Sequence, residues 1–243
     1  MILRRFHGDG DCFVELDDAV RTLTTREVYF NCNFGMRPPA ESIVYNTDFV
    51  GIHCNPEAWR GLEIWDFCQR NIALYPADIP VKHVPIGYHS SMKRFERRPP
   101  AERDIDVVFA GAMNARRQKV LDGFRMAGLA VVWIDILFGA KRDTIYARSK
   151  LALNMRYYED GVYTTVRASH LVANGMPMLS ETSPEMPEWA GDHVGVDQLV
   201  DAGVQMLKHH EALDEIALEL RAVFETKPWV LPPPRCICGV ERH

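Results

Sequence analysis

Short apolar runs alternate with polar segments along most of the chain of 243 residues. In the first hundred residues, four of these runs have the length of strands, and residues 67–74 are compatible with a helix. Runs without a polar side are typical of a sheet that is covered on both faces. The four runs span residues 28–31, 43–46, 62–65 and 81–84.

A more regular alternation of strands and helices begins near residue 105. This pattern predicts βαβ units, which have right-handed crossovers and a parallel, doubly wound sheet. The predicted strands span residues 105–110, 130–134, 151–155 and 176–180, and the predicted helices span 115–127, 141–148 and 163–173. Apolar residues at helical spacing over 200–224, followed by prolines, predict closing helices and an extended tail.

The boundary between the two lobes is predicted at residues 93–104, which read KRFERRPPAERD. This stretch is charged, contains two prolines and has little to bury, as is usual for a connection between domains. We therefore expect an N-terminal lobe over residues 1–98, a C-terminal lobe over 99–226 and an extended tail over 227–243.

Candidate ligand-binding residues lie directly after the predicted strands, because open α/β sheets bind ligands beyond the carboxyl ends of their strands. Gly111 and Asn114 follow the first strand of the second lobe, and Arg116 and Arg117 open the next helix. Free backbone N–H groups and a guanidinium suit a diphosphate. In the alternative interpretation, the arginines form the solvated face of a helix and the glycine marks a tight turn.

Two further turns of the second lobe carry charge. In one of them, Lys141 opens a helix after Gly139. Lys141 then adds positive charge beside the first turn if the strands are neighbours, or it belongs to the start of a plain surface helix. In the other turn, Glu159 is a candidate acceptor for sugar hydroxyls, Arg167 for neutralising a phosphate, and Tyr158 for stacking on a base. The alternative is that Glu159 caps the helix and pairs with Arg167. The G-x-G-x-x-G fingerprint is absent, which disfavours a nicotinamide dehydrogenase.

Composition narrows the function classes. The formal net charge of −5 provides no overall cationic field for nucleic acid or anionic membranes. The N-terminus lacks the apolar run of a signal peptide, and no window approaches eighteen consecutive apolar residues. We expect a cytoplasmic protein with no integral membrane segment and no nucleic-acid partner, with its six cysteines reduced.

Two short clusters contain metal-ligand types but lack the spacing of a site. His7, Asp9, Asp11 and Cys12 do not match a calcium loop, and Cys236 with Cys238 falls short of four zinc ligands. We expect no bound metal and no cofactor.

Several stretches between residues 43 and 181 resemble GT-B-type glycosyltransferases, in particular bacterial family-1-like and CgeB-like proteins. The most specific stretch is LNMRYYEDGVYTTVRASHLVANGMPMLSE, residues 153–181, and DIDVVFAGAMNARRQKVL, residues 104–121, is also similar. Supporting stretches in the first lobe are IVYNTDF, WDFCQRN and VPIGY.

The resemblance implies two facing Rossmann-like lobes, with the nucleotide-sugar held mainly by the C-terminal lobe and the acceptor in the cleft. It also implies no obligatory metal, and a C-terminal helix that crosses back to the first lobe. The chain departs from the pattern in its short N-terminal lobe. It also departs at Arg167, which stands eight positions after Glu159, where many retaining enzymes have a second glutamate.

The expected function is transfer of a sugar from a nucleotide-diphosphate donor to an unidentified acceptor. Asp48 and His53, after the strand at 43–46, are candidate catalytic bases, or else ordinary turn and loop residues. The alternative function is a non-catalytic nucleotide- or glycan-binding protein with a degenerate GT-B fold. The sequence leaves the nucleotide, the sugar, the acceptor, the stereochemical course and any oligomer open.

Overall fold

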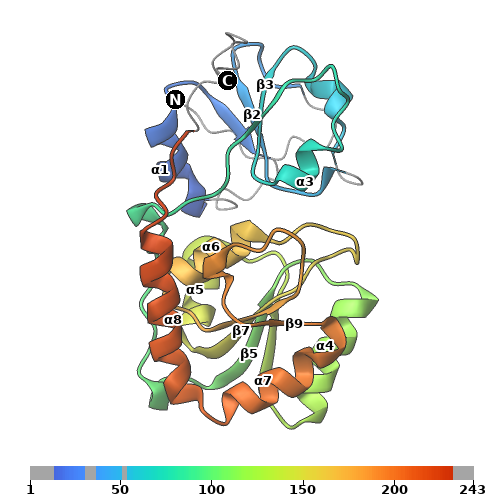
Figure 1. The fold of residues 1–243 in the computed structure, drawn as a ribbon. Coiled ribbons are helices and arrows are strands. Elements are labelled where there is room, and N and C mark those ends of the chain that lie inside the picture. The colour runs from blue at the N-terminus through green and yellow to red at the C-terminus, as the bar shows by residue number, and fades with distance from the viewer. Residues whose placement is uncertain (1–13, 31–36, 51–53, 232–243) are drawn as a thin grey trace, which may run out of the picture.

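The computed structural model describes residues 14–30, 37–50 and 54–231. The chain forms two α/β lobes, each built on its own parallel sheet, which lie end to end (Figure 1). This arrangement confirms the predicted fold class of two Rossmann-like lobes with parallel sheets. The limits assigned to the two domains stay predictions.

The first lobe contains a four-stranded sheet in the order β1-β2-β3-β4, with every neighbouring pair parallel. Strands β1 and β2 are buried throughout, as expected of an apolar sheet covered on both faces. The strands are β1 (Val28–Phe30), β2 (Ile43–Asn46), β3 (Glu63–Asp66) and β4 (Val81–His83), and the helices are α1 (Val14–Leu23) and α3 (Gln69–Ile72).

The second lobe contains a five-stranded parallel sheet in the order β6-β5-β7-β8-β9. Its strands are β5 (Ile105–Ala110), β6 (Val131–Ile134), β7 (Ser149–Asn154), β8 (Met178–Glu181) and β9 (His193–Val194). Its helices are α4 (Ala115–Met126), α5 (Gly139–Ala147), α6 (Thr165–Ala173), α7 (Leu199–Leu207) and α8 (His210–Glu225). None of the helices in the described ranges has the length and apolar content needed to span a bilayer.

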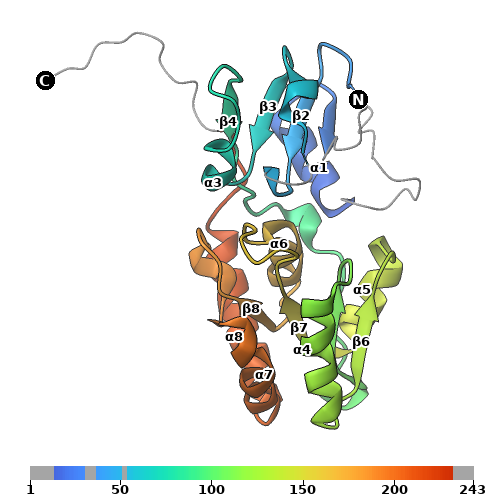
Figure 2. The ribbon, with the colours of Figure 1, turned by 90° about the vertical axis from the view of Figure 1, so that its right-hand side faces the viewer.

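Alternating residues of the strands face the two sides of the second sheet. Val107 and Phe109 pack with residues of α4 and α7, whereas Val108 packs with residues of α5 and α6. Figure 2 shows α4 and α5 on either side of the sheet edge formed by β6. The strand order reverses between β5 and β7, so this pair forms the topological switch point where such sheets bind ligands.

Several predicted elements differ from those observed. The strand at 105–110 is confirmed at both ends, but the helix predicted from residue 163 begins at Thr165. Helix α1 and strand β9 were not predicted. The charged stretch 93–104 is less exposed than its composition suggests, because Arg97 and Arg103 are buried and both pair with Asp214 of α8.

The segment after α8, residues 227–231, returns to the first lobe, and we call it the strap. The Tyr88 N–H donates to the Lys227 carbonyl at 2.7 Å, and the Trp229 N–H donates to the Tyr88 carbonyl at 2.9 Å. The Trp229 ring is buried 5.9 Å from the Tyr45 ring. A Cβ atom at Gly87 would lie 2.6 Å from the Trp229 backbone, so this close approach requires glycine. The crossing back that the resemblance implied is therefore made by the strap, beyond the end of α8.

Replacing Trp229 with alanine should destabilise the protein by about 3–5 kcal/mol, because a large buried ring between the strap and the first lobe is lost. Urea denaturation measures this change. The matched control is Val230→Ala in the same strap, where the side chain is 60% exposed and a change within about 0.5 kcal/mol is expected. Equal effects of the two substitutions would contradict the anchoring role of Trp229.

Candidate functional site

Three adjoining cavities lie along the cleft between the lobes. The β6-side cavity has a volume of about 240 Å³, the switch-point cavity about 350 Å³ and the strap cavity about 690 Å³. The first two share Thr47, Asp48, Thr164 and Arg167, and the last two share Phe67. Their walls come from segments that follow β2, β3, β5 and β7, so the carboxyl ends of both sheets face this cleft.

Arg167 lies at the centre of this row, in the first half of α6. Its Nη1 donates to Asn154 Oδ1 at 2.9 Å and to the Met155 carbonyl at 3.3 Å, at the end of β7. Its guanidinium also lies 5.0 Å from the centre of the Phe109 ring of β5. Arg167 therefore spans the switch point between β5 and β7.

The charge of Arg167 has no carboxylate partner among the residues that the structure describes. Burial lowers the pKa of its guanidinium below the ordinary value. Gly111, with a φ of +146°, makes room for this side chain, because a Cβ there would lie 2.6 Å from Arg167 Nη2. The alternative in which Arg167 pairs with Glu159 is wrong, as is the capping role of Glu159, since α6 has Thr164 as its N-cap.

Arg117 and Asn114 hold the turn after β5 in place. The Asn114 side chain accepts from the Arg117 N–H at 2.9 Å and donates to the Tyr157 carbonyl at 2.7 Å. The buried Arg117 guanidinium donates to the Ala112 and Met155 carbonyls at 2.6 and 2.5 Å. Burial, followed by the nearby charge of Arg167, lowers the pKa of Arg117 to about 9. These contacts brace the β5 and β7 loops against each other.

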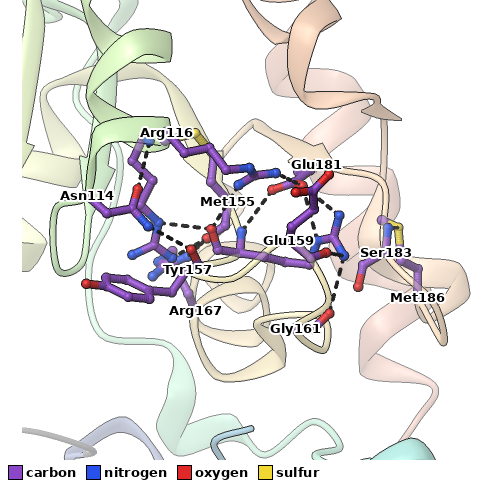
Figure 3. Close-up of polar contacts among 12 residues, drawn as sticks. Asn114, Arg116, Met155, Tyr157, Glu159, Gly161, Arg167, Glu181, Ser183 and Met186 are labelled. Carbon is purple, nitrogen blue, oxygen red and sulfur yellow. Dashed lines mark hydrogen bonds and ion pairs between the residues drawn. The ribbon is translucent and has the colours of Figure 1, made fainter. Parts of the chain in front are cut away.

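Arg116 turns away from the cavities toward the end of β8, where it pairs with Glu181 (Figure 3). Arg156 pairs with the same carboxylate at 2.7 Å and also donates to the Glu159 carbonyl oxygen. The Glu181 carboxylate is 2% exposed, and its negative charge is shared by the guanidinium groups of Arg116 and Arg156. Neither Arg156 nor Glu181 was predicted as a site residue, although Arg156 lies two positions after β7 and Glu181 is the last residue of β8.

Of the remaining residues predicted to bind the donor, one lines a cavity and two do not. Tyr158 lines the switch-point cavity, with its ring 4.8 Å from that of Tyr157. The Glu159 side chain is exposed and is not part of the wall of any of the three cavities. Lys141 is also exposed outside these walls, and its neighbour Arg142 lines the β6-side cavity instead. The binding roles of Glu159 and Lys141 stay predictions.

Arg142 belongs to a buried polar cluster that the sequence analysis missed. Its guanidinium donates to Asp143 Oδ1 at 3.1 Å, and His170 Nε2 lies 2.8 Å from the same oxygen. Burial alone would raise the pKa of Asp143. The hydrogen bond from His170 and the charges of His170 and Arg142 together outweigh burial, so the pKa of Asp143 is below the ordinary value. The sequence predicted helices over 141–148 and 163–173, but hydrophobic periodicity does not indicate which buried polar residues of two helices meet.

Asp48 faces the same cavities as Arg167, but from the first lobe. Its Oδ1 accepts from the Phe49 N–H at 2.8 Å, and its carbonyl accepts from Asn46 and Asn71 at 2.9 and 2.7 Å. Both amides also donate to the buried Asp66 carboxylate, at 2.8 and 3.2 Å. Asp66 thus orients the loop that presents Asp48. His53, the second candidate base, lies outside the described residues.

No group of three or more potential metal ligands occurs within the described ranges. Cys54 and Cys68 are free thiols, and burial raises the pKa of Cys68 to about 12. The other four cysteines and His7 lie outside the described residues. The absence of a metal or cofactor remains an expectation.

Comparison with known sequences finds no matching family model. The chain is 30% identical over 130 residues to the uncharacterized protein L140 of Acanthamoeba polyphaga mimivirus, covering 51% of this chain and 42% of that protein. It is 27% identical over 158 residues to the uncharacterized protein L137 of the same virus, covering 60% and 21%. The chain therefore spans less than half the length of these curated relatives.

Comparison with solved structures finds several distant matches. One is AviGT4, a glycosyltransferase involved in avilamycin A biosynthesis, at a TM-score of 0.48 and 14% identity, covering 88% of this chain and 86% of that one. Another is Acinetobacter baumannii MurG, at 0.38 and 9%, covering 86% and 73%. A third is the Glycosylation Associate Protein (Gap123) complex from Streptococcus agalactiae, at 0.42 and 11%, covering 84% and 53%.

The buried Asp66 predicts a specific pH dependence. Burial raises the pKa of Asp66 to about 6, so between about pH 4 and pH 6 the folded state binds more protons than the unfolded state. The contribution of Asp66 to the free energy of unfolding should therefore fall by roughly 3 kcal/mol as the pH rises through this window.

Urea denaturation at pH 4.5 and pH 7 tests this dependence. The free energy of unfolding should differ less between pH 4.5 and pH 7 in Asp66→Asn than in the wild-type protein, because the asparagine side chain does not titrate. This difference should be unchanged in Asp122→Asn, a surface control whose side chain is 50% exposed. A wild-type difference that survives in Asp66→Asn would contradict the assignment.

Proposed function

We propose that this protein is a glycosyltransferase that uses a nucleotide-diphosphate sugar. The observation that carries the proposal is the position of Arg167, a cation without a carboxylate partner among the described residues. Arg167 lies at the topological switch point and lines both the β6-side cavity and the switch-point cavity. A guanidinium in that position suits a diphosphate, and its charge stabilises the diphosphate as it leaves.

The carboxylate opposite Arg167 supports a catalytic role. Asp48 comes from the first lobe, whereas Arg167 comes from the second, so the two groups approach a bound molecule from opposite sides. In the transfer step, the acceptor hydroxyl oxygen bonds to the anomeric carbon while the bond from that carbon to the diphosphate oxygen breaks. The diphosphate leaves with the electron pair, and Asp48 takes the hydroxyl proton as the general base.

A non-catalytic nucleotide- or glycan-binding protein is the second candidate function. It is favoured by the internal pairing of Arg116 with Glu181 and by the exposed position of Glu159 away from the cavities. These two predicted donor-binding residues would then serve only to hold the loops. Both candidate functions allow nucleotide binding, but only the glycosyltransferase would turn over a nucleotide-sugar.

Nucleotide binding should depend on Arg167. A nucleoside diphosphate at about 100 times its Kd stabilises the folded state by about 2.7 kcal/mol, which raises the Tm by roughly 5–10 °C for a protein of this size. Thermal unfolding with UDP, GDP, ADP, dTDP or CMP should show such a shift for one nucleotide. The shift should be lost in Arg167→Ala, measured against the Tm of that variant without nucleotide.

The matched control is Arg125→Ala, which removes an exposed arginine of α4 that pairs with Asp122 of the same helix. This variant should keep the full shift. If Arg167→Ala keeps the shift as well, or if no nucleotide stabilises the wild-type protein, the donor site does not lie at the switch point.

Turnover should depend on Asp48. Asp48→Asn should lower the rate of sugar transfer or of slow donor hydrolysis on the order of 10²–10⁴-fold, because a general base is lost. The Tm shift caused by the nucleotide should be retained. Asp122→Asn, a half-exposed acid of α4 outside the walls of all three cavities, is the control and should change the rate less than threefold. Nucleotide binding without any turnover in the wild-type protein would support the second candidate function instead.

A further inference from the structure

The strap cavity is the largest of the three cavities in the cleft, with a volume of about 690 Å³. The first lobe contributes the segments after β3 and β4, the second lobe contributes residues 185–189, and the strap closes one side. A volume of this size accommodates a complete small molecule, since ligand sites usually span about 300–1,000 Å³.

The charged groups around this cavity already have partners inside the protein. Glu188 pairs with Lys227 of the strap. Glu185 Oε2 accepts from Cys68 Sγ and from the Arg70 N–H, both at 3.1 Å. These charged side chains are exposed, so a charged ligand would gain little from them, because water screens interactions between exposed charges.

The rest of the wall is largely apolar. Phe67, Ile86 and Trp189 are each less than 10% exposed, and Val230 of the strap lies at the surface with 60% exposure. His83 is engaged as well, because its Nε2 lies 3.2 Å from the Phe67 carbonyl oxygen. Contact with apolar surface is therefore the main source of binding energy that this cavity offers.

The cavity also adjoins the proposed transfer site. Phe67 lines both the strap cavity and the switch-point cavity, and Thr165 lines the strap cavity while its neighbour Thr164 lines the other two. A molecule held in the strap cavity can therefore extend one end past Phe67 toward Asp48 and Arg167.

We infer that the strap cavity binds an uncharged molecule with an apolar ring or chain, and that this molecule is the acceptor, whose hydroxyl reaches the switch-point cavity. The binding part of this inference follows from the cavity itself, and the acceptor part rests on the proposed function. The ligand class is thus an apolar alcohol or phenol, in contrast to a free sugar or a charged metabolite.

Isothermal titration calorimetry with 2-naphthol, in the absence of nucleotide, tests the binding part. The wild-type protein should bind 2-naphthol at least tenfold more tightly than 2-naphthoate, which keeps the ring and adds a charge, and should show no heat with glucose. Equal affinity for 2-naphthol and 2-naphthoate, or no binding of 2-naphthol, would overturn the inference.

Two neighbouring substitutions in the strap locate the bound molecule. Val230→Asp places a charge in the cavity wall and should weaken 2-naphthol binding at least tenfold. Leu231→Asp places the same charge on the next residue, which is 38% exposed and outside the described cavity wall, and should weaken binding less than twofold. Equal losses would overturn the assignment to this cavity.

The acceptor part is tested by incubating the protein with 2-naphthol and the nucleotide-sugar whose diphosphate raises the Tm. Formation of a naphthyl glycoside, reduced at least tenfold in Val230→Asp, supports the inference. Transfer to glucose but not to bound 2-naphthol overturns the acceptor assignment and leaves the proposed transferase intact. Binding of 2-naphthol without binding of any nucleotide overturns the proposed function and leaves the ligand class of the cavity standing.

Discussion

The position of one partly buried cation, Arg167, sets the character of the cleft. Its guanidinium bonds to the end of β7, stacks near Phe109 of β5, and lies in the space left by Gly111. Removing part of this charge from water, with no carboxylate partner in the part of the chain that the structure describes, is unfavourable, as the lowered pKa of the group reflects. The fold nevertheless places it at the point where the strand order reverses, which makes an anionic ligand its natural counter-charge.

The neighbouring arginines, unlike Arg167, are held largely by contacts within the same loops. Arg117 is satisfied by backbone carbonyls, and Arg116 shares the Glu181 carboxylate with Arg156. These contacts fix the loops after β5, β7 and β8 relative to one another, so Arg167 projects from a braced frame. A site of this kind is preorganised, because little rearrangement is needed when a ligand binds.

The sequence predicted the layout of the fold better than the partners within the site. The strand at 105–110 was predicted at both ends because an apolar run lies between Asp104 and Gly111. Helix α1 was missed although Leu16, Ala19 and Val20 follow helical spacing, and β9 has only two residues. Arg116 and Glu181 are 65 positions apart, and no local pattern indicates that they meet. The same holds for the contact between Asp66 of β3 and Asn46 of the adjacent strand β2, which are 20 positions apart.

The strap explains why a short first lobe still forms a closed cleft. Trp229 inserts beside Tyr45, and the Tyr88 backbone pairs with residues 227 and 229, so the end of the second lobe becomes part of the first. This link also builds a wall of the strap cavity, and the pairing of Glu188 with Lys227 neutralises the charge at that wall. The same few residues that hold the lobes together therefore leave an apolar surface next to Asp48 and Arg167. A cleft with a cation at its centre and an apolar cavity at one end fits the proposed joining of a charged donor to an uncharged acceptor.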